Sequence, residues 1–360
     1  MSPRNVVMLC SCTHIRVLLI VGCVVLSTTI FLLDVASIVR DSNEFTRTLV
    51  DQHGSKHMTV GSKKKVPWWD GGTECASTNV SSLGKFQHST GSIAEAEASC
   101  GERASAMGTD QKVVSFTLYG DDPQYAQGLE DNIVTIAQLY PGYLVRLYTD
   151  PRGNKDLLCP LLQQYPTLFV CDVTSLPGIH DQLMNIHPQM WRFAPMGDPQ
   201  VQILLVRDID SLVSPREVAA VREWLLSDTV LHTMRDHPQH HEPIMAGMWG
   251  VRTKKKVTAK HLADIKNEMF ANARGDFSHG LDQKLLKKVV WAQLHTNTYG
   301  HDSFKCHTFW HSHPWPTKRP DDRAFVGSPV FRAEWKNNLA IEMECPDYCR
   351  PKKHKDWIYC

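Results

Sequence analysis

Strand-like and helix-like segments alternate between residues 113 and 226, and this alternation constrains the fold more than any other feature of the sequence. Runs rich in β-branched and aromatic residues predict strands over 113–119, 143–149, 168–173 and 201–207. Helical spacing of apolar residues predicts helices over 129–140, 156–164, 181–192 and 215–226. Strands that alternate with helices favour an α/β fold, with a mostly parallel sheet covered by helices on both faces.

The composition excludes some classes of function. The chain has 360 residues, 42% hydrophobic and 21% charged, which is ordinary for a globular protein. Its net charge of +1 provides no overall field for nucleic acid, so a nucleic-acid partner is not expected. No GxGxxG motif follows the first predicted strand, which argues against a dinucleotide-binding enzyme.

The first 39 residues predict a targeting segment. Residues 17–33 carry no charge, and Arg4 and Arg16 precede them. The positive-inside rule then predicts a cytoplasmic tail over 1–16, a transmembrane signal anchor over 17–39 and a luminal remainder. A cleaved signal peptide is the alternative, because Val35, Ala36 and Ser37 form a small-residue cleavage site. Both interpretations direct the protein to the secretory pathway.

Residues 40–110 lack apolar periodicity and predict a luminal stem, which leaves 111–360 as the main domain. Pro67, Trp68 and Trp69 are expected to dock onto that domain. Eight cysteines follow residue 39, which in an oxidising lumen allows up to four disulfides of undetermined pairing. Asn79 begins a glycosylation sequon that is usable only in the lumen.

Two aspartates follow the apolar run over 201–207. Asp208 and Asp210 are separated by Ile209. In extended backbone the two carboxylates would point the same way, while Ile209 would turn to the core. Ligands of open α/β sheets bind beyond the carboxyl ends of the strands, and paired carboxylates suit Mg²⁺ or Mn²⁺. The other interpretation is structural, with one aspartate capping a helix and the other lying in a turn.

The predicted tail, single anchor, stem, α/β domain and Asp-x-Asp motif together resemble a Golgi-type glycosyltransferase of the GT-A fold. The resemblance covers about residues 111–330 and implies a Rossmann-like sheet. It also implies a metal-dependent reaction that moves a sugar from a nucleoside-diphosphate sugar to a hydroxyl of a glycan, glycoprotein or glycolipid. The location implied is the Golgi or endoplasmic reticulum membrane, with the catalytic domain luminal. Retention at the anomeric carbon is one possible outcome.

The resemblance also implies roles for individual residues. Asp282 and Gln283 open a helical stretch, similar to the acceptor- and sugar-binding pair of retaining enzymes of this fold, and are the implied catalytic residues. Asp282 as a plain helix cap would look the same. Residues implied to bind the donor are Arg192, Arg207, Asp208, Arg235, Asp236, Gly247, Trp249 and Lys318. For Arg235 and Asp236 a structural ion pair is the alternative. Gly247 would let backbone approach the sugar, and Trp249 would offer a stacking face.

Histidines gather over residues 301–316 and are the candidates for a third metal ligand. His301 is the first choice, with His311 and His313 behind it, although the His-x-x-Gly-x-x-Lys pattern of glycogenin-like families is absent. The same stretch supports a rival function, because His307, His311 and His313 have the residue types of a zinc site in a luminal hydrolase. A carbohydrate-binding relative without activity is the third alternative.

Overall fold

The computed structural model describes residues 66–72, 75, 99–176, 178–309, 311–329 and 340–360, which belong to one compact unit spanning Lys65–Cys360. The predicted tail, the anchor over 17–39 and the sequon at Asn79 lie outside the described residues. Within the described part of the chain, none of the helices is both long and apolar enough to cross a membrane.

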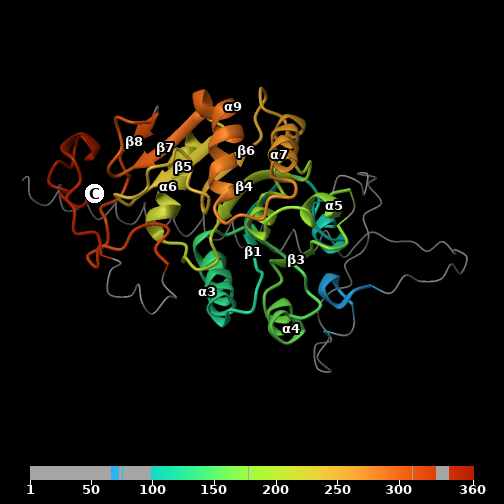
Figure 1. Cartoon of the computed structure of the whole chain (residues 1–360). Helices are drawn as coiled ribbons and strands as arrows, with labels where there is room; N and C mark the ends of the chain where they lie inside the picture. The colour runs from blue at the N-terminus through green and yellow to red at the C-terminus, as the bar shows by residue number, and fades with distance from the viewer. Residues whose placement is uncertain (1–65, 73–74, 76–98, 177, 310, 330–339) are drawn as a thin grey trace, which may run out of the picture. The chain divides into compact units, whose positions relative to one another are not determined.

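An eight-stranded sheet in the order β3-β2-β1-β4-β6-β5-β7-β8 forms the centre of the unit (Figure 1). The strands are β1 (Gln111–Thr117), β2 (Tyr143–Thr149), β3 (Leu168–Asp172), β4 (Val201–Arg207), β5 (Leu231–Arg235), β6 (Met248–Arg252), β7 (Thr298–Asp302) and β8 (Ser312–His313). Only β6 is antiparallel to its neighbours β4 and β5, so the sheet is mostly parallel, as the sequence predicts.

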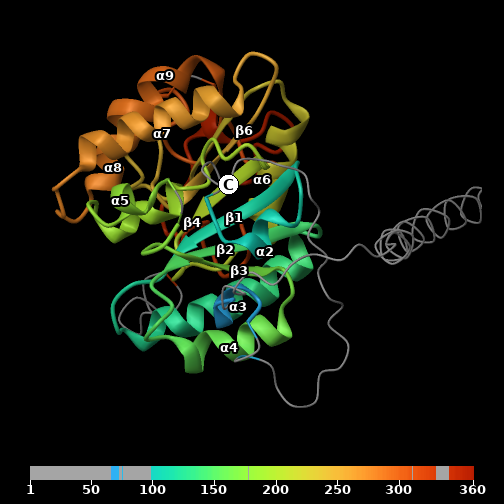
Figure 2. The ribbon, with the colours of Figure 1, turned by 90° about the vertical axis from the view of Figure 1, so that its right-hand side faces the viewer.

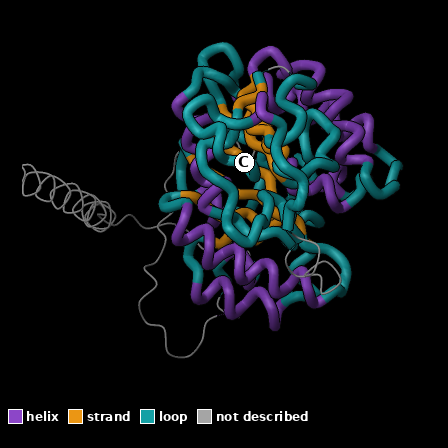
Figure 3. Tube along the Cα trace, turned by 90° about the vertical axis from the view of Figure 1, so that its left-hand side faces the viewer, coloured by secondary structure: helices purple, strands orange, loops and turns teal. Residues whose placement is uncertain are grey.

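Helices cover both faces of the sheet (Figures 2 and 3). One face carries α3 (Pro123–Leu139), α4 (Lys155–Gln164) and α6 (Pro215–Leu226), whose apolar residues form one core cluster. The other carries α5 (His180–Leu183), α7 (Ala259–Ala273), α8 (Leu281–Leu285), the π-helix η5 (Leu286–Trp291) and α9 (Ala292–Leu294). Within β4, Leu204 and Val206 join this second cluster while Ile203 and Leu205 join the first, as the alternation of strand side chains requires.

The remaining short helices are α2 (Glu102–Ser105) and four segments of 3₁₀ helix: η1 (Trp68–Asp70), η4 (Pro188–Phe193), η6 (His295–Asn297) and η8 (Asp347–Cys349). The segment η4 differs from a prediction. The helix expected over 181–192 is divided into α5 and η4 around Pro188. Proline has no backbone N–H to donate and disfavours helical backbone in the residue before it, so one continuous helix is not available to this segment.

The folded unit begins before residue 110, where the sequence suggested a boundary. Trp68 is buried in the core cluster of α3 and α4, as its expected docking requires. Asp70 accepts hydrogen bonds from the backbone N–H groups of Glu102 and Arg103 at 2.8 and 3.0 Å. The described parts of the predicted stem therefore belong to the same compact unit as the sheet.

Four disulfides fasten the ends of this unit. They join Cys75 to Cys159, Cys100 to Cys171, Cys306 to Cys349 and Cys345 to Cys360. The first two attach the segment before β1 to α4 and β3, and the last two hold the C-terminal segment to the end of β7 and to itself. All eight cysteines beyond residue 39 are used.

Candidate active site

A hollow of about 330 Å³ lies where the strand order of the sheet reverses. The strand order begins β3-β2-β1-β4, so β1 and β4 are neighbours in the sheet. The chain leaves β1 toward β2 on one side and leaves β4 toward the strands on the other side. Open α/β sheets bind ligands in the crevice beyond the carboxyl ends of such a strand pair. The hollow has that position: Leu118 and Tyr119 follow β1, and Asp208, Ile209 and Asp210 follow β4.

A second hollow, of about 390 Å³, lies at the opposite ends of the strands, near Pro199 and Thr258. It is the larger of the two, but its charged lining consists of Asp110 and Lys254, so it has no pair of carboxylates. We therefore place the chemistry in the hollow beyond β1 and β4.

The Asp-x-Asp segment differs from its predicted geometry. The chain turns at Ile209 and Asp210 instead of remaining extended, so alternation along a strand is not what aims the carboxylates. Ile209 is buried, as predicted, and Asp208 and Asp210 are half-buried and line the same hollow. The turn therefore brings the two carboxylates to one cavity, which is the arrangement that the prediction of extended backbone required.

Asn132 of α3 fixes this turn and was not singled out from the sequence. Its amide nitrogen donates to the backbone oxygens of Ile209 and Ser211 at 3.1 and 3.0 Å, and its side-chain oxygen accepts from the N–H of Val213 at 3.3 Å. The residue is fully buried. A signal was available, because Asn132 is the one polar member of the buried helical stripe that also contains Leu129, Ile133 and Ile136.

Arg192 connects two of the predicted site residues across the floor of the hollow. Its guanidinium donates to Oδ1 of Asp208 and, at 3.1 Å, to Oδ2 of Asp282. Burial disfavours the charge of Arg192, but the two carboxylates outweigh that cost and raise its pKa. The buried guanidinium of Arg192 therefore binds two carboxylates at once. One belongs to Asp208, whose side chain is 41% exposed, and the other to Asp282, whose side chain is 5% exposed.

Asp282 and Gln283 are engaged by the protein itself. Oδ1 of Asp282 accepts from the N–H of Gln283 at 2.8 Å, so both of its oxygens have partners. The Gln283 amide donates to the backbone oxygen of Ile244 and accepts from the N–H of Ala246 at 3.0 Å. In this structure the pair positions Arg192 and the segment before β6, and neither side chain is open to a sugar as the resemblance implied.

Gly247 lies against the carboxylate of Asp208. A Cβ atom at position 247 would overlap Oδ2 and Cγ of Asp208, so only glycine leaves that carboxylate its present place. Gly247 therefore lies beside the metal-ligand candidate Asp208, and its predicted contact with a donor sugar stays a prediction. Trp249, two residues on, is fully buried on β6 and packs on Phe193 with ring centroids 5.5 Å apart. Since β6 is paired on both edges and covered on both faces, Trp249 has no face to offer a sugar.

Other predicted donor-binding residues take part in structural ion pairs. Arg207 is buried and pairs with Glu217 of α6 at 2.6 Å. Arg235 pairs with Asp302 of β7 at 2.6 Å. Asp236 is bound by Arg216 at 3.0 Å and Arg319 at 2.6 Å; burial favours its neutral form, but the two guanidiniums hold its pKa below the usual value. For Arg235 and Asp236 the structural alternative is the observed one.

Lys318 is also outside the lining of the hollow. Its side chain is exposed, and its amino group lies 3.6 Å from a carboxylate oxygen of Asp321.

His301 does not lie beside Asp208 and Asp210. It lies on β7, and β6 and β5 separate that strand from β4. Both ring nitrogens are occupied: Nδ1 lies 2.9 Å from Nε2 of His232, and Nε2 lies 3.0 Å from Oε2 of Glu223. The structure thus makes His301 part of a buried polar chain, and the predicted ligand set of Asp208, Asp210 and His301 is not assembled.

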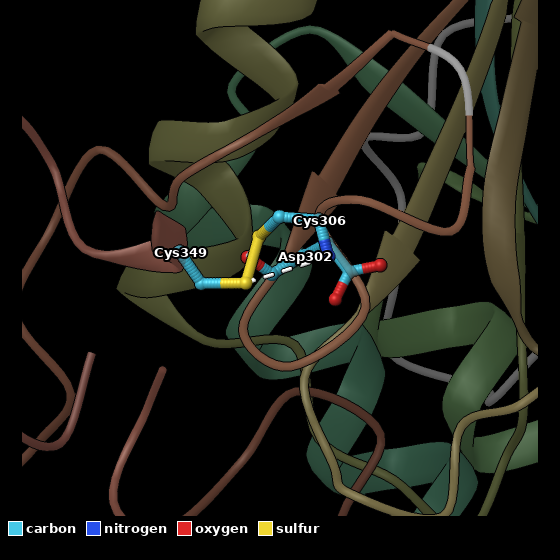
Figure 4. A group of neighbouring side chains, drawn as sticks. All are labelled: Asp302, Cys306 and Cys349. Atoms are coloured by element: carbon cyan, nitrogen blue, oxygen red, sulfur yellow. Dashed lines mark hydrogen bonds between the residues drawn. A yellow bond between two sulfur atoms is a disulfide. The ribbon is translucent and has the colours of Figure 1, made fainter. Parts of the chain in front are cut away.

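The late histidines do not form a zinc site either. Among the described residues, three ligand atoms of the metal-binding types come within 4.8 Å of one another only at Asp302, Cys306 and Cys349. Figure 4 shows why that group is not a metal site, since the two sulfurs are joined as a disulfide. The Asp302 carboxylate already pairs with Arg235 and accepts from the N–H of Phe304 at 2.9 Å. His307 instead stacks on Tyr348, and His313 stacks on Tyr299.

The residues of the hollow fit a hard divalent cation. Two carboxylates line it, and the other polar lining groups are the guanidinium of Arg192, which donates to Asp208, the hydroxyls of Thr117, Tyr119 and Tyr125, the amide of Gln189 and the imidazole of His279. Oxygen-rich sets of this kind suit Mg²⁺ or Mn²⁺. Asp208 and Asp210 are the residues that would hold the ion, with Arg192 and Gly247 fixing the orientation of Asp208.

No protein-family model matches the sequence, and no curated protein matches it. Solved structures with partial similarity include the galactosyltransferase LgtC in complex with donor and acceptor sugar analogues, with 15% identity, a TM-score of 0.35 and coverage of 54% of this chain and 74% of that chain. A glycosyltransferase involved in the glycosylation of the major capsid of PBCV-1 has 14% identity, a TM-score of 0.34 and coverage of 53% and 81%.

A third structure is 4-diphosphocytidyl-2C-methyl-D-erythritol synthase from Anaerococcus prevotii, with 11% identity, a TM-score of 0.32 and coverage of 50% and 84%. All three TM-scores are below 0.5 and all three identities are below 25%, so these likenesses are too distant to assign an activity.

Proposed function

We propose that this protein is a metal-dependent glycosyltransferase that moves a sugar from a nucleoside-diphosphate sugar to an acceptor hydroxyl. The observation that carries the proposal is the position of Asp208 and Asp210, which line one hollow beyond the carboxyl ends of β1 and β4. That crevice is where open α/β sheets bind nucleotides. The intact Asp-x-Asp motif favours an active enzyme over a carbohydrate-binding relative.

The chain's own residues have distinct roles in this proposal. Asp208 and Asp210 would hold Mn²⁺ or Mg²⁺, and the ion would supply charge neutralisation for the diphosphate leaving group. Arg192 orients the Asp208 carboxylate, because it donates to that carboxylate from a buried site and is itself fixed by Asp282. The hydroxyls of Tyr119 and Tyr125 and the amide of Gln189 line the remaining wall and would face the donor. During transfer the bond from the anomeric carbon to the phosphate oxygen breaks and a bond to the acceptor oxygen forms. The nucleoside diphosphate leaves with the electron pair of the broken bond, and the proton of the acceptor hydroxyl passes to that diphosphate and then to solvent.

Action in the secretory pathway is the second part of the proposal. Its support is the use of four disulfides, which persist in oxidising compartments and are rare in the cytosol. The charge-free residues 17–33 agree with an N-terminal membrane anchor and a luminal catalytic domain.

Hydrolysis of a panel of sugar nucleotides tests the activity directly. The protein is expected to release nucleoside diphosphate slowly from one sugar nucleotide when Mn²⁺ is present and to stop after chelation. Asp208→Asn should abolish the release. Hydrolysis of none of the panel, together with metal-independent binding of a free glycan, would instead support the carbohydrate-binding alternative.

A further inference from the structure

A row of aromatic and imidazole rings leads out of the hollow toward the segment after α7. The ring centroids of Tyr119 and His187 lie 5.9 Å apart, and those of His187 and His279 lie 6.5 Å apart. Tyr119 and His279 both line the hollow. Residues 274–280, which contain His279, therefore form one border of its entrance.

Four cations lie in this segment and in the helices that follow it, and we name them the basic ridge: Arg274, Lys284, Lys287 and Lys288. All four are exposed. Lys284, Lys287 and Lys288 are spaced three and four positions apart along α8 and η5, so they share one helical face. Lys288 donates to Oδ1 of Asn272 at 2.9 Å, which ties η5 to α7, and Figure 2 shows these helices side by side.

Cations outnumber acidic residues along the border and the ridge. Residues 274–288 carry four Lys and Arg against two Asp and Glu, whereas the whole chain carries 39 against 38. One of the two acidic residues, Asp282, is buried against Arg192. Within the ridge, Lys287 has an acidic partner in Glu242 at 3.1 Å. This part of the chain therefore has a local excess of positive charge.

Exposed apolar side chains accompany the cations. Phe277 is 55% exposed, and Met184 at the end of α5 is 48% exposed. The N–H of Gly275 donates to the backbone oxygen of Asn185 at 2.8 Å, which places the segment after α7 beside the end of α5. An aromatic face next to several cations suits a sugar ring that carries an acidic group, because the ring packs on the apolar face while the acid pairs with the cations.

We infer that the basic ridge receives an anionic glycan, a polysaccharide bearing carboxylate or sulfate groups, as the acceptor of the reaction. That the glycan is the acceptor of a transfer reaction rests on the proposed function. That the glycan is anionic rests on charge complementarity with the ridge. An anionic membrane surface is the competing partner for a basic, partly apolar patch. It is less favoured for a luminal domain, because the strong negative surface potential belongs to the cytoplasmic leaflet.

The test measures binding of the full-length protein to heparin (sulfated), hyaluronan (carboxylate only) and dextran (neutral). We expect binding to at least one anionic chain, none to dextran, and weakening with added salt, since exposed charges are screened. The triple variant Lys284→Gln, Lys287→Gln, Lys288→Gln should bind about tenfold more weakly. Its matched control is Lys255→Gln, Lys256→Gln, Lys260→Gln, which removes the same charge near the start of α7 and should bind as wild type does.

The outcomes separate this inference from the proposed function. Equal loss in both triple variants, or no loss in either, overturns the role of the ridge. Ridge-dependent binding to vesicles of anionic phospholipid without binding to either polysaccharide overturns the glycan in favour of a membrane. Ridge-dependent polysaccharide binding in a protein that binds no nucleotide with Mn²⁺ supports the ridge and contradicts the transferase. Metal-dependent hydrolysis of a sugar nucleotide should survive in the ridge variant, which also shows that it is folded.

Discussion

Arg192 and Asp282 are 90 residues apart in the sequence and form an ion pair of 3.1 Å in which each side chain is only 5% exposed. The same guanidinium binds Asp208 at the end of β4. One buried cation thus links the start of α8 to the candidate metal site. Because both side chains are almost entirely buried, loss of either one would leave the other without its buried partner.

Replacement of Arg192 is expected to destabilise the fold strongly. Arg192→Met leaves the Asp282 carboxylate buried without its cation, and loss of one partner of a buried pair costs about 3–5 kcal/mol. Denaturant unfolding measures the change. Arg152→Met is the control, because Arg152 is half exposed in its pairs with Asp150 and Asp172 and should cost no more than about 1 kcal/mol. Similar losses in the two variants would show that Arg192 is not the buried support described here.

Gly247→Ala is expected to weaken the metal site without unfolding the protein. The new Cβ would meet Oδ2 and Cγ of Asp208, so that carboxylate must move. The backbone of Gly247 is not in the left-handed region, so alanine adds no backbone strain. Mn²⁺-dependent binding of a nucleoside diphosphate should fall about tenfold or more. Gly153→Ala, whose Cβ would meet nothing within 4 Å, should bind normally. Normal binding in both would place the metal away from Asp208.

Asn132→Leu should loosen the turn that carries Asp210. The substitution keeps the size of the side chain but leaves the carbonyls of Ile209 and Ser211 and the N–H of Val213 without their partner. We expect a loss of about 3 kcal/mol in the free energy of unfolding, together with weaker metal binding. Gln127→Leu on the exposed part of α3 should change neither quantity. Loss of stability with metal affinity intact would mean that Asn132 supports the helix but not the site.

Stability should fall as the pH drops from 7 to 5. Burial lowers the pKa of His232 and His301, and it lowers the pKa of His240 to about 3. Below the ordinary histidine pKa the unfolded chain takes up protons that the folded protein does not, so the free energy of unfolding falls by up to about 1.4 kcal/mol per pH unit for each such residue.

His240→Asn isolates one contribution to this pH dependence. The asparagine oxygen can accept from the N–H of Asp236 as Nδ1 of His240 does. The slope of unfolding free energy against pH should therefore decrease by about 1.4 kcal/mol per unit. His261→Gln, at an exposed position of α7, should leave the slope as it is. A slope that His240→Asn does not change would show that this residue titrates alike in both states.

The sequence predicted the parts of the fold that depend on local pattern. The strands over 143–149 and 201–207 and the helix over 215–226 have the same bounds in the structure, because each is a strong apolar pattern ended by a turn or a cap. Strands β6 and β7 were not predicted. Their residues include Trp249 and His301, and long-range pairing with β4 and β5 decides that these are strands.

The candidate site was predictable in location and less so in detail. An Asp-x-Asp motif after a buried strand predicts two carboxylates at the carboxyl edge of the sheet, and Asp208 and Asp210 lie there, since strand ends are a local property. Which side chains meet there is a long-range property. Arg192 pairs with Asp282 from 90 residues away, and His301 is held by Glu223 from 78 residues away. A sequence does not show which distant charged or polar side chains pair with each other. The roles predicted for His301, Gln283 and Trp249 therefore differ from the contacts that these residues make.

Calorimetric titration of nucleoside diphosphates tests the central claim most directly. The titrations use UDP, GDP, CDP and ADP, with Mn²⁺ and with chelator, on wild type, Asp208→Asn, Asp210→Asn and the exposed control Asp228→Asn. We expect wild type and Asp228→Asn to bind one of these nucleotides only with Mn²⁺, and Asp208→Asn and Asp210→Asn not to bind it. Mn²⁺-dependent binding that persists unchanged in Asp208→Asn and Asp210→Asn would contradict the account.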